Sequence, residues 1–254
     1  MGFSEMTSTK ITFIGHSTLL LEVNGVKVLT DPIFGKYPRY IFFFRREWNA
    51  GKTIKEVLAE GIDAILLSHN HLDHYHVPSL REFPRDVPFF VPLGYKSYVQ
   101  SAYRHFTDIH ELEVWQSERF KGITITLVPA YHTRKGKGYV IEGEHTLYFP
   151  GDTGYFQGIN EFPNRFSHFD VIFLPMMQHV PEFWRDLLPH IDPHDGVKIV
   201  KILKPRKYAI PIHFGFYPTL GNPLKIPDQF KELLEKEGLG HLYHLLRNGE
   251  TLEL

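Results

Sequence analysis

Residues 68–74 read Ser-His-Asn-His-Leu-Asp-His and directly follow the apolar run Ala-Ile-Leu-Leu of residues 64–67. Imidazole and carboxylate groups bind zinc, iron and manganese, so three histidines and one aspartate within six positions indicate a metal site. If the backbone stays extended after residue 67, His69 and His71 point to the same side, because side chains alternate along a strand. Asp73 and His74 then belong to the following turn, and one segment offers two ligands to each of two metals. The competing interpretation is a polar loop in a chain with 16 histidines.

The composition limits the class of protein. With 254 residues, of which 43% are hydrophobic, the chain is long enough to form a single domain over residues 1–254. The net charge of −1 provides no general attraction to nucleic acid. The absence of cysteine excludes disulfides and thiolate metal sites. Because neither a signal peptide nor an apolar run of roughly 20 residues is visible, we expect a cytoplasmic protein.

Strands and helices are predicted to alternate in two similar halves. The first strands are expected at residues 10–14, 18–23 and 26–30, with an Asn-Gly turn signal between the last two. A capping box of Thr53 and Glu56 begins one helix, and Asp192 with Pro193 begins another. A second Asn-Gly signal, at residues 248–249, predicts a hairpin between strands at residues 242–246 and 251–254. We expect a mixed α/β fold in which the two halves pack sheet on sheet, with helices outside.

Further metal ligands are expected where other predicted strands end. His132 follows the strand at residues 123–128, Asp152 follows the strand at 146–149, and His213 follows the strand at 208–212. Ligand sites in sheet folds favour the carboxyl ends of strands, where loops converge over a rigid scaffold. The predicted strand ends are therefore expected to meet at one site.

The chain resembles the metallo-β-lactamase superfamily, whose His-x-His-x-Asp-His signature matches residues 69–74. The family fold is a four-layer αβ/βα sandwich, which agrees with the two-half order of elements. The resemblance implies two divalent metal ions, with zinc the first choice and manganese or iron as alternatives. It also implies seven ligands, with Asp152 between the metals: His69, His71 and His132 on one metal, and Asp73, His74 and His213 on the other.

Two such dications would lower the pKa of a bridging water enough to supply hydroxide near neutral pH. In a formal count, +4 from the metals, −2 from Asp73 and Asp152 and −1 from hydroxide leave a charge of +1. Such a centre favours an anionic substrate, and phosphate esters fit better than neutral amides. The expected activity is therefore metal-dependent hydrolysis by a hydroxide that bridges two metals.

Three further residues are candidates for supporting roles. Asp31 ends a predicted strand and would accept the free N–H of a ligand histidine, or only cap its own Asp-Pro turn. His16 lies in a turn between two strands, and either approaches the site or bonds within that turn. His190 precedes the second capped helix, where it would donate a proton to the substrate or leaving group, or only bond nearby backbone. We assign Asp73 and His190 as the catalytic residues.

Within the superfamily, several stretches look like the branch that contains N-acyl-phosphatidylethanolamine-hydrolysing phospholipase D. They are residues 14–18, 29–34, 68–71, 90–94, 151–156 and 190–193. The match implies a phosphodiesterase for phospholipid-type substrates, and we expect substrate contacts from Tyr155, Phe156, His179 and Trp184. Residues 178–184 follow the branch only loosely, which leaves the substrate open. A sugar-phosphate lactonase or other small phosphate-ester hydrolase is the alternative, and a non-catalytic metal-binding scaffold is a third hypothesis.

Residues 37–48 read Tyr-Pro-Arg-Tyr-Ile-Phe-Phe-Phe-Arg-Arg-Glu-Trp and depart from the Pro-rich segment of that branch. These aromatic and arginine side chains suit a peripheral membrane contact in which the arginines meet lipid phosphate. They also suit a loop folded onto the core, or a contact in a homo-oligomer. We favour the core loop or the oligomer contact, because apolar runs at a protein surface more often mark protein contacts than lipid contacts.

Overall fold

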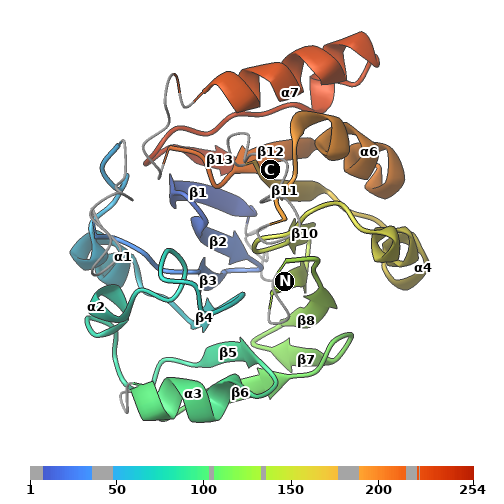
Figure 1. Cartoon of the computed structure of the whole chain (residues 1–254). Helices are drawn as coiled ribbons and strands as arrows, with labels where there is room; N and C mark the ends of the chain where they lie inside the picture. The colour runs from blue at the N-terminus through green and yellow to red at the C-terminus, as the bar shows by residue number, and fades with distance from the viewer. Residues whose placement is uncertain are drawn as a thin grey trace, which may run out of the picture.

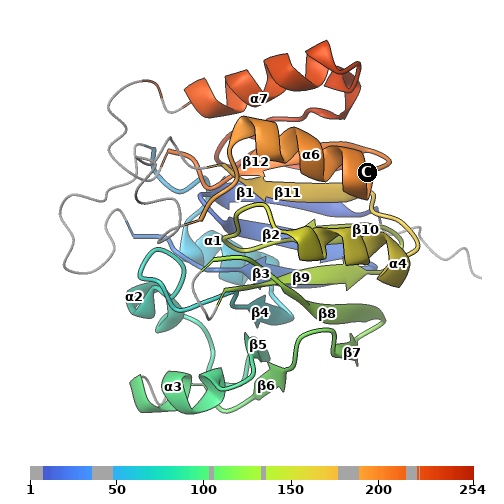
Figure 2. The same ribbon diagram turned by 45° about the vertical axis from the view of Figure 1, so that its right-hand side comes forward.

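The structure, a computed structural model, describes residues 8–35, 48–102, 106–132, 136–176, 189–215, 222 and 224–254. Two β-sheets pack face to face, and helices cover the outer face of each sheet (Figure 1). Turning the molecule by 45° brings the helices on the second sheet to the front (Figure 2). The expected four-layer αβ/βα sandwich is therefore confirmed.

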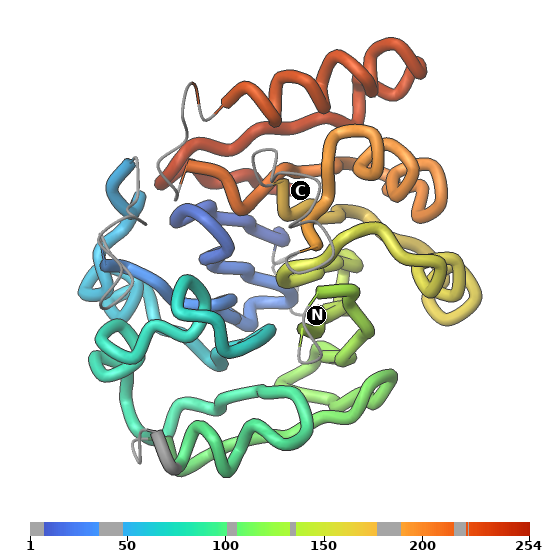
Figure 3. Tube along the Cα trace, viewed as in Figure 1, coloured from blue at the N-terminus to red at the C-terminus, as the bar shows by residue number. Residues whose placement is uncertain are grey.

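The first sheet has seven strands in the order β13-β1-β2-β3-β4-β5-β6. Strands β1, β2 and β3 form the expected antiparallel meander, and β3 to β6 run parallel to one another. Strand β13, from the far end of the chain, pairs with β1, so the blue and red ends of the trace meet (Figure 3). The bounds are β1 (Lys10–Gly15), β2 (Thr18–Val23), β3 (Val26–Thr30), β4 (Ala64–Leu66), β5 (Phe89–Pro92), β6 (Ile109–Leu112) and β13 (Thr251–Glu253).

The second sheet has six strands in the order β12-β11-β10-β9-β8-β7. Strands β10, β11 and β12 are parallel, and β7 to β10 are joined in antiparallel pairs. Strands β8, β10 and β12 therefore run in one direction, and their carboxyl ends lie at one edge of the sheet. The bounds are β7 (Ser117–Phe120), β8 (Ile123–Pro129), β9 (Lys137–Glu142), β10 (Thr146–Phe149), β11 (Val171–Pro175) and β12 (Tyr208–Ile212).

Two capped helices confirm the signals in the sequence. Thr53 and Glu56 form the reciprocal capping box at the start of α1, and the Asp192 carboxylate accepts the Asp195 N–H at the start of α6. The helices on the first sheet are α1 (Ile54–Glu60), α2 (Val77–Leu80) and α3 (Tyr95–Ala102). Those on the second are the 3-10 helix η1 (Gln157–Glu161), α4 (Phe162–Arg165), α6 (Pro193–Leu203), α7 (Lys225–Lys236) and the 3-10 helix η2 (Gly240–Leu242). None of the helices that the structure describes combines the length and apolar character needed to cross a membrane.

Three apolar clusters hold the four layers together. The central cluster lies between the sheets and contains fully buried side chains from both, such as Leu21 and Ile141. The outer clusters join each sheet to its helices, with Val57 of α1 in one and Phe230 of α7 in the other. Burial of apolar surface contributes about 25 cal/mol per Å², so this packing makes the strands a rigid support for the loops at their ends.

The prediction of a hairpin around residues 248–249 is wrong. Residues 242–246 contain the end of η2 and only a single bridge, in which Tyr243 lies beside Ala209. After the turn, the Gly249 N–H donates to the Phe13 carbonyl, and β13 continues along β1. The open edge of β1 thus provides the hydrogen-bond partners that the hairpin strand was expected to supply. Strand β7, whose residues alternate between exposed and half-buried, was also not predicted.

Candidate metal centre

Residues from four strand ends converge at one edge of the sandwich. Four overlapping groups of side chains there each have ligand atoms within 4.8 Å of one another, and the two largest have four members each. The first cluster consists of His69, His71, His132 and Asp152, and the second cluster consists of His16, Asp73, His74 and His213. The structure thus brings together all seven of the predicted ligands, in the two groups that the resemblance implied, and adds His16 to the second.

Asp152, which follows β10, lies between the two clusters. Its Oδ2 is 3.1 Å from His74 Nε2, 3.6 Å from His69 Nε2 and 3.7 Å from His132 Nε2. Its Oδ1 is 3.1 Å from His213 Nε2. One carboxylate therefore faces histidines of both clusters, which is the placement expected of a bridging ligand.

Asp31, which follows β3, fixes the segment that carries the first two ligands. Its Oδ1 accepts the Ser68 N–H at 2.7 Å, and its Oδ2 accepts the Ser68 hydroxyl at 2.5 Å. The same Oδ2 accepts His74 Nδ1–H at 2.7 Å. Asp31 thus orients a histidine of the second cluster as well as Ser68, rather than only capping its own turn.

Backbone geometry directs three of these residues into the site. His16, Asp31 and His213 each have a positive φ, of 60°, 33° and 64°. Non-glycine residues adopt this region at a cost on the order of 1–3 kcal/mol, and such positions cluster at functional sites. The His213 N–H donates to the His16 carbonyl at 3.0 Å, so two of the strained turns support each other.

The hydrogen-bond partners of three histidines establish which nitrogen carries the proton. Carboxylate and carbonyl oxygens only accept, so His74 donates from Nδ1 to Asp31, and His132 donates from Nδ1 to the Pro189 carbonyl at 3.0 Å. The Ser68 hydroxyl is committed to Asp31, so its oxygen accepts His69 Nδ1–H at 2.9 Å. In the neutral form, each ring therefore directs an Nε2 lone pair toward Asp152.

These directed lone pairs fit metal ions. A lone pair that faces a buried carboxylate is repelled by it unless a positive charge lies between them. No group among the described residues hydrogen-bonds to the buried His69 Nε2. His74 Nε2 and His213 Nε2 lie 3.3 Å apart, and His132 Nε2 lies 3.2 Å from His71 Nδ1. Nitrogen and oxygen donors of this kind suit zinc, manganese and iron.

The pKa values in the site follow burial and the two carboxylates. Burial lowers the pKa of His69 and His71, and lowers that of His132 to about 4. Burial also lowers the pKa of His74 and His213, but Asp152 and Asp73 outweigh it. The pKa of His74 therefore lies well above its usual range, and that of His213 rises to about 8.

The pKa values of the two carboxylates and of His16 are all lowered. Burial raises the pKa of Asp152 and Asp73, but the surrounding histidines outweigh it and hold both values well below the usual range. Burial, reinforced by His213, holds the pKa of His16 well below 6.5. The site thus contains two ionised carboxylates that favour positive charge between the clusters.

His190 lies at the same site, next to the shared carboxylate. Its Nε2 is 3.2 Å from Asp152 Oδ2, and its ring centroid is 5.0 Å from those of His132 and His213. The N-cap of α6, two residues later, fixes the chain at this point. The structure therefore places His190 within hydrogen-bond reach of a group at the centre, and not only against nearby backbone.

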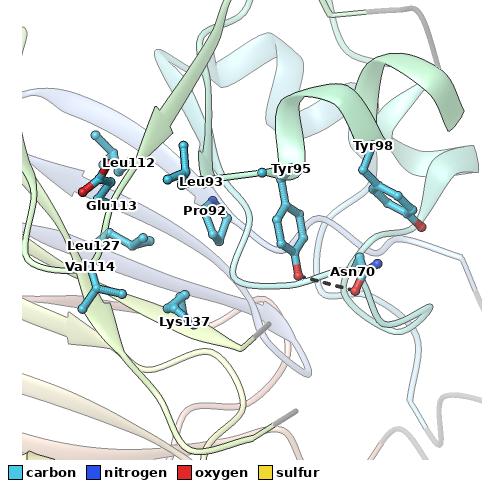
Figure 4. A pocket seen from close by; sticks show the side chains of 11 residues that line it. Asn70, Pro92, Leu93, Tyr95, Tyr98, Leu112, Glu113, Val114, Leu127 and Lys137 are labelled. Carbon is cyan, nitrogen blue, oxygen red and sulfur yellow. Dashed lines mark hydrogen bonds between the residues drawn. The ribbon is translucent and has the colours of Figure 1, made fainter. Parts of the chain in front are cut away.

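A pocket of about 500 Å³ lies beside the loop that carries His69 and His71. Asn70, between these two histidines, accepts a hydrogen bond from the Tyr95 hydroxyl at 3.4 Å. Figure 4 shows Tyr95, Tyr98 and Asn70 on one side of the pocket, with Leu112, Glu113, Val114, Leu127 and Lys137 on the other. Its volume falls within the roughly 300–1,000 Å³ of small-molecule sites.

The predicted substrate contacts are placed less clearly than the metal ligands. The Tyr155 ring lies 5.2 Å from Lys198 Nζ of α6, and Phe156 packs against the outer core of the second sheet. Their contact with substrate stays a prediction. His179, Trp184 and residues 37–47 lie outside the described residues. Trp48, described at the end of that aromatic run, contacts Phe214 with ring centroids 6.3 Å apart.

Two groups that position the ligands were not predicted from the sequence. Ser68 links Asp31 to His69, and the Pro189 carbonyl orients His132. The position of Ser68, directly before the first ligand, was a usable signal because a hydroxyl there reaches the neighbouring imidazole. No residue type marks a carbonyl partner, so Pro189 required the folded chain.

Known proteins confirm the family. The family model described as a beta-lactamase superfamily domain matches residues 26–214. The chain therefore belongs to the beta-lactamase superfamily. This chain is 29% identical over 251 residues to the N-acyl-phosphatidylethanolamine-hydrolyzing phospholipase D 1 of Caenorhabditis elegans. The alignment covers 88% of this chain and 69% of the nematode protein. The chain spans only 60% of similar uncharacterised mycobacterial proteins.

Two further proteins match this chain over nearly its whole length, one in sequence and one in fold. A UPF0173 metal-dependent hydrolase of Methanopyrus kandleri is 26% identical over 257 residues, covering 96% of this chain and 99% of that protein. A solved structure described as a possible metal-dependent hydrolase from Veillonella parvula has a TM-score of 0.81 at 18% identity, covering 98% of this chain and all of that one. This chain is therefore a metal-dependent hydrolase with His/Asp clusters that can bind metal.

Proposed function

We propose that this hydrolase is a phosphodiesterase that uses two divalent metal ions, with zinc the first choice, and acts on anionic, phospholipid-like substrates. The observation that carries the proposal is that the Nε2 atoms of His69 and His132 in the first cluster, and of His74 in the second, all face the single carboxylate of Asp152. The similarity to the nematode phospholipase D supports the choice of a phosphodiester.

In this proposal, the first cluster holds one metal and the second cluster holds the other. When bound, two such ions supply a hydroxide from water near neutral pH and attract the oxygens of an anionic ester. With metal bound, the chain would contribute two ionised carboxylates, Asp73 and Asp152, and neutral imidazoles that have lost their Nε2 protons. Two dications and two carboxylates leave a positive centre, which favours a phosphate ester over an uncharged amide.

His190 is the chain's candidate for proton transfer. Its Nε2 is 3.2 Å from Asp152 Oδ2, and 7% of its side-chain surface is exposed. From this position it would donate a proton to the oxygen that leaves the phosphate, while Asp152 keeps the ring oriented. Asp73, the second assigned catalytic residue, is ionised and would contribute its negative charge to holding the metal of the second cluster.

The pocket beside Asn70 would accept the part of the substrate that does not react. Its walls are mainly apolar, from Pro92, Leu112 and Leu127, and Lys137 brings one half-buried ammonium. Val114 lies at its rim with 37% of its surface exposed. Val114→Trp should therefore raise the KM for a lipid substrate and leave that for a small diester unchanged.

The main test uses purified protein with bis(p-nitrophenyl) phosphate and with N-acyl-phosphatidylethanolamine in mixed micelles. We expect hydrolysis of both diesters, loss of activity with a chelator, and recovery with added Zn²⁺ or Mn²⁺. A metal-loaded protein that cleaves a sugar-phosphate lactone but neither diester would overturn the phosphodiesterase proposal. Bound metal with no hydrolysis of any of the three would favour the scaffold.

A further inference from the structure

The second cluster contains one more histidine than the seven-ligand pattern requires. His16 is 3% exposed and comes from the turn between β1 and β2, far in sequence from the other members. Its Nε2 lies 3.2 Å from Asp73 Oδ2, the same oxygen that lies 3.6 Å from His213 Nε2 and 3.7 Å from His74 Nε2. All four ligand atoms are thus directed at one small volume.

We propose that His16 is a direct ligand of the second metal, so that this site is held by His16, Asp73, His74 and His213 together with the shared Asp152. The inference rests on the proposed two-metal centre and assigns it an additional ligand. It concerns how the chain binds metal and does not depend on which ester is cleaved.

The turn that carries His16 is built to hold the ring in place. The residue has a left-handed backbone with φ of 60°, and its carbonyl accepts the His213 N–H. Next to it, the Ser17 carbonyl accepts the Thr30 hydroxyl at 2.7 Å, and Thr18 Oγ1 donates to the Asp31 carbonyl at 2.8 Å. The turn is therefore fastened to the strand end that also orients His74, and its strain is consistent with a functional role.

The distances between ring centroids are consistent with His16, His74 and His213 facing one metal position. The His16 ring centroid is 4.0 Å from that of His213 and 5.3 Å from that of His74. Within the first cluster, His69 and His71 have centroids 4.5 Å apart, and His71 and His132 are 4.9 Å apart. His16 thus lies as close to its neighbours as the ligands of the first cluster lie to one another.

This assignment makes the two metal sites unequal. The second site would have five protein donors, all from buried residues, whereas the first has four, of which His71 is half-buried. Closed sites hold structural metals, and sites with open positions hold catalytic ones. The first metal would therefore keep the open positions for water and substrate, and the second would be the more tightly bound ion.

The deciding experiment counts imidazole nitrogens on each metal in the unaltered protein. Protein with ¹⁵N-labelled histidine is loaded with two equivalents of ¹¹³Cd²⁺, and the ¹¹³Cd–¹⁵N couplings are measured by NMR. We expect two cadmium signals, each coupled to three imidazole nitrogens. One signal coupled to three nitrogens and the other to only two would overturn the assignment. Absence of bound cadmium would instead count against the two-metal centre itself.

Variants provide an independent test that does not use activity. His16→Gln keeps an N–H that can bond to Asp73 but loses the imidazole lone pair. Loss of a residue that hydrogen-bonds to a metal ligand costs roughly 10–100-fold in metal affinity. Loss of a ligand itself should therefore lower the affinity for one of two bound Co²⁺ ions by about 100-fold or more, and change the visible absorption spectrum. His110→Gln removes a half-buried histidine that lies between Asp108 and Glu118, and should leave both affinities unchanged. Wild-type affinities in His16→Gln would show that His16 only hydrogen-bonds to Asp73.

Discussion

Both edges of the sandwich carry buried or half-buried acidic side chains, but these contact different partners. One edge is the edge where β4 and β11 begin, and there Asp63 directly precedes β4 and Asp170 directly precedes β11. Asp63 accepts hydrogen bonds from the Lys27 backbone N–H at 2.9 Å and from Lys121 Nζ at 2.5 Å. Asp170 Oδ2 accepts the Thr146 N–H at 2.8 Å. These carboxylates meet N–H donors and hold neighbouring segments together.

At the edge where strands end, Asp152 faces imidazole nitrogens of both clusters, and three of these present lone pairs when neutral. Their protons are already committed on the far side of each ring, to Asp31, Ser68 and the Pro189 carbonyl. A carboxylate that meets donors is satisfied by the protein alone. One that meets the lone pairs of neutral imidazoles requires a positive charge, which protons on His74 and His213 supply when no metal is bound. The two edges are therefore distinguished by where the neighbouring protons lie, and not by residue type. We call the edge that carries Asp152 the metal edge, and the edge that carries Asp63 and Asp170 the structural edge.

The largest effect is expected from Asp152→Asn, which keeps the size of the side chain and removes its charge. Metal affinity should fall by at least about 100-fold, because changes at outer partners alone cost roughly 10–100-fold, and hydrolysis should fall with it. Metal content after dialysis and activity are the measurements. The matched control at the other edge is Asp170→Asn, which should keep its metal while losing about 1–3 kcal/mol of unfolding free energy. Equal metal loss in both variants would contradict the comparison.

His190→Gln should have the next largest effect, and on a different quantity. Removal of a general acid typically lowers the rate about 10²–10⁴-fold, so kcat should fall within that range. The ligand sets of both clusters remain intact in this variant, and the number of bound metals should not change. Steady-state kinetics and metal analysis on the same preparation separate the two quantities. A variant with full kcat, or one that has lost a metal, would show that His190 has another role.

Asp31→Asn should weaken the metal centre from outside it. The amide group accepts fewer hydrogen bonds than the carboxylate that now binds Ser68 and His74, so the orientation of His69 and His74 is less fixed. Metal affinity should fall by about 10–100-fold, as for other partners of metal-bound histidines. A competition assay with a chromophoric chelator measures this change. Wild-type affinity would mean that the packing of the strands alone orients the ligands.

Much of the site could be predicted because its ligands occupy fixed places in the pattern of strands. His69, Asp152 and His213 each follow a short apolar run that forms a buried strand, and parallel strands bring their ends together. The capping residues Thr53 and Asp192 were recognisable for a similar reason, since a helix start needs a side-chain acceptor at one defined position.

The errors came from contacts between distant segments. The segment at residues 242–246 has strand-like composition, but β13 found a better partner in the open edge of β1. Strand β7 lacks an apolar face and forms because β8 offers it a ladder of hydrogen bonds. His16 was only a candidate for proximity, because the left-handed turn that directs its ring is not encoded by a glycine or asparagine at that position.

The smallest effect belongs to the structural edge, where Asp63 should contribute to stability through its charge. Burial raises its pKa, but the hydrogen bonds from Lys121 and the Lys27 N–H outweigh this, so the folded pKa lies below the usual 3.8. Such a group stabilises the fold above its unfolded pKa, and this contribution is lost as the pH falls through the folded value. Because the pair with Lys121 is largely solvated, Asp63→Asn should cost less than about 1 kcal/mol at pH 7. In urea unfolding with chelator present, the difference from wild type should shrink as the pH falls below 3.8. A change in metal affinity in this variant would mean that the two edges are coupled, and that the distinction between them is not local.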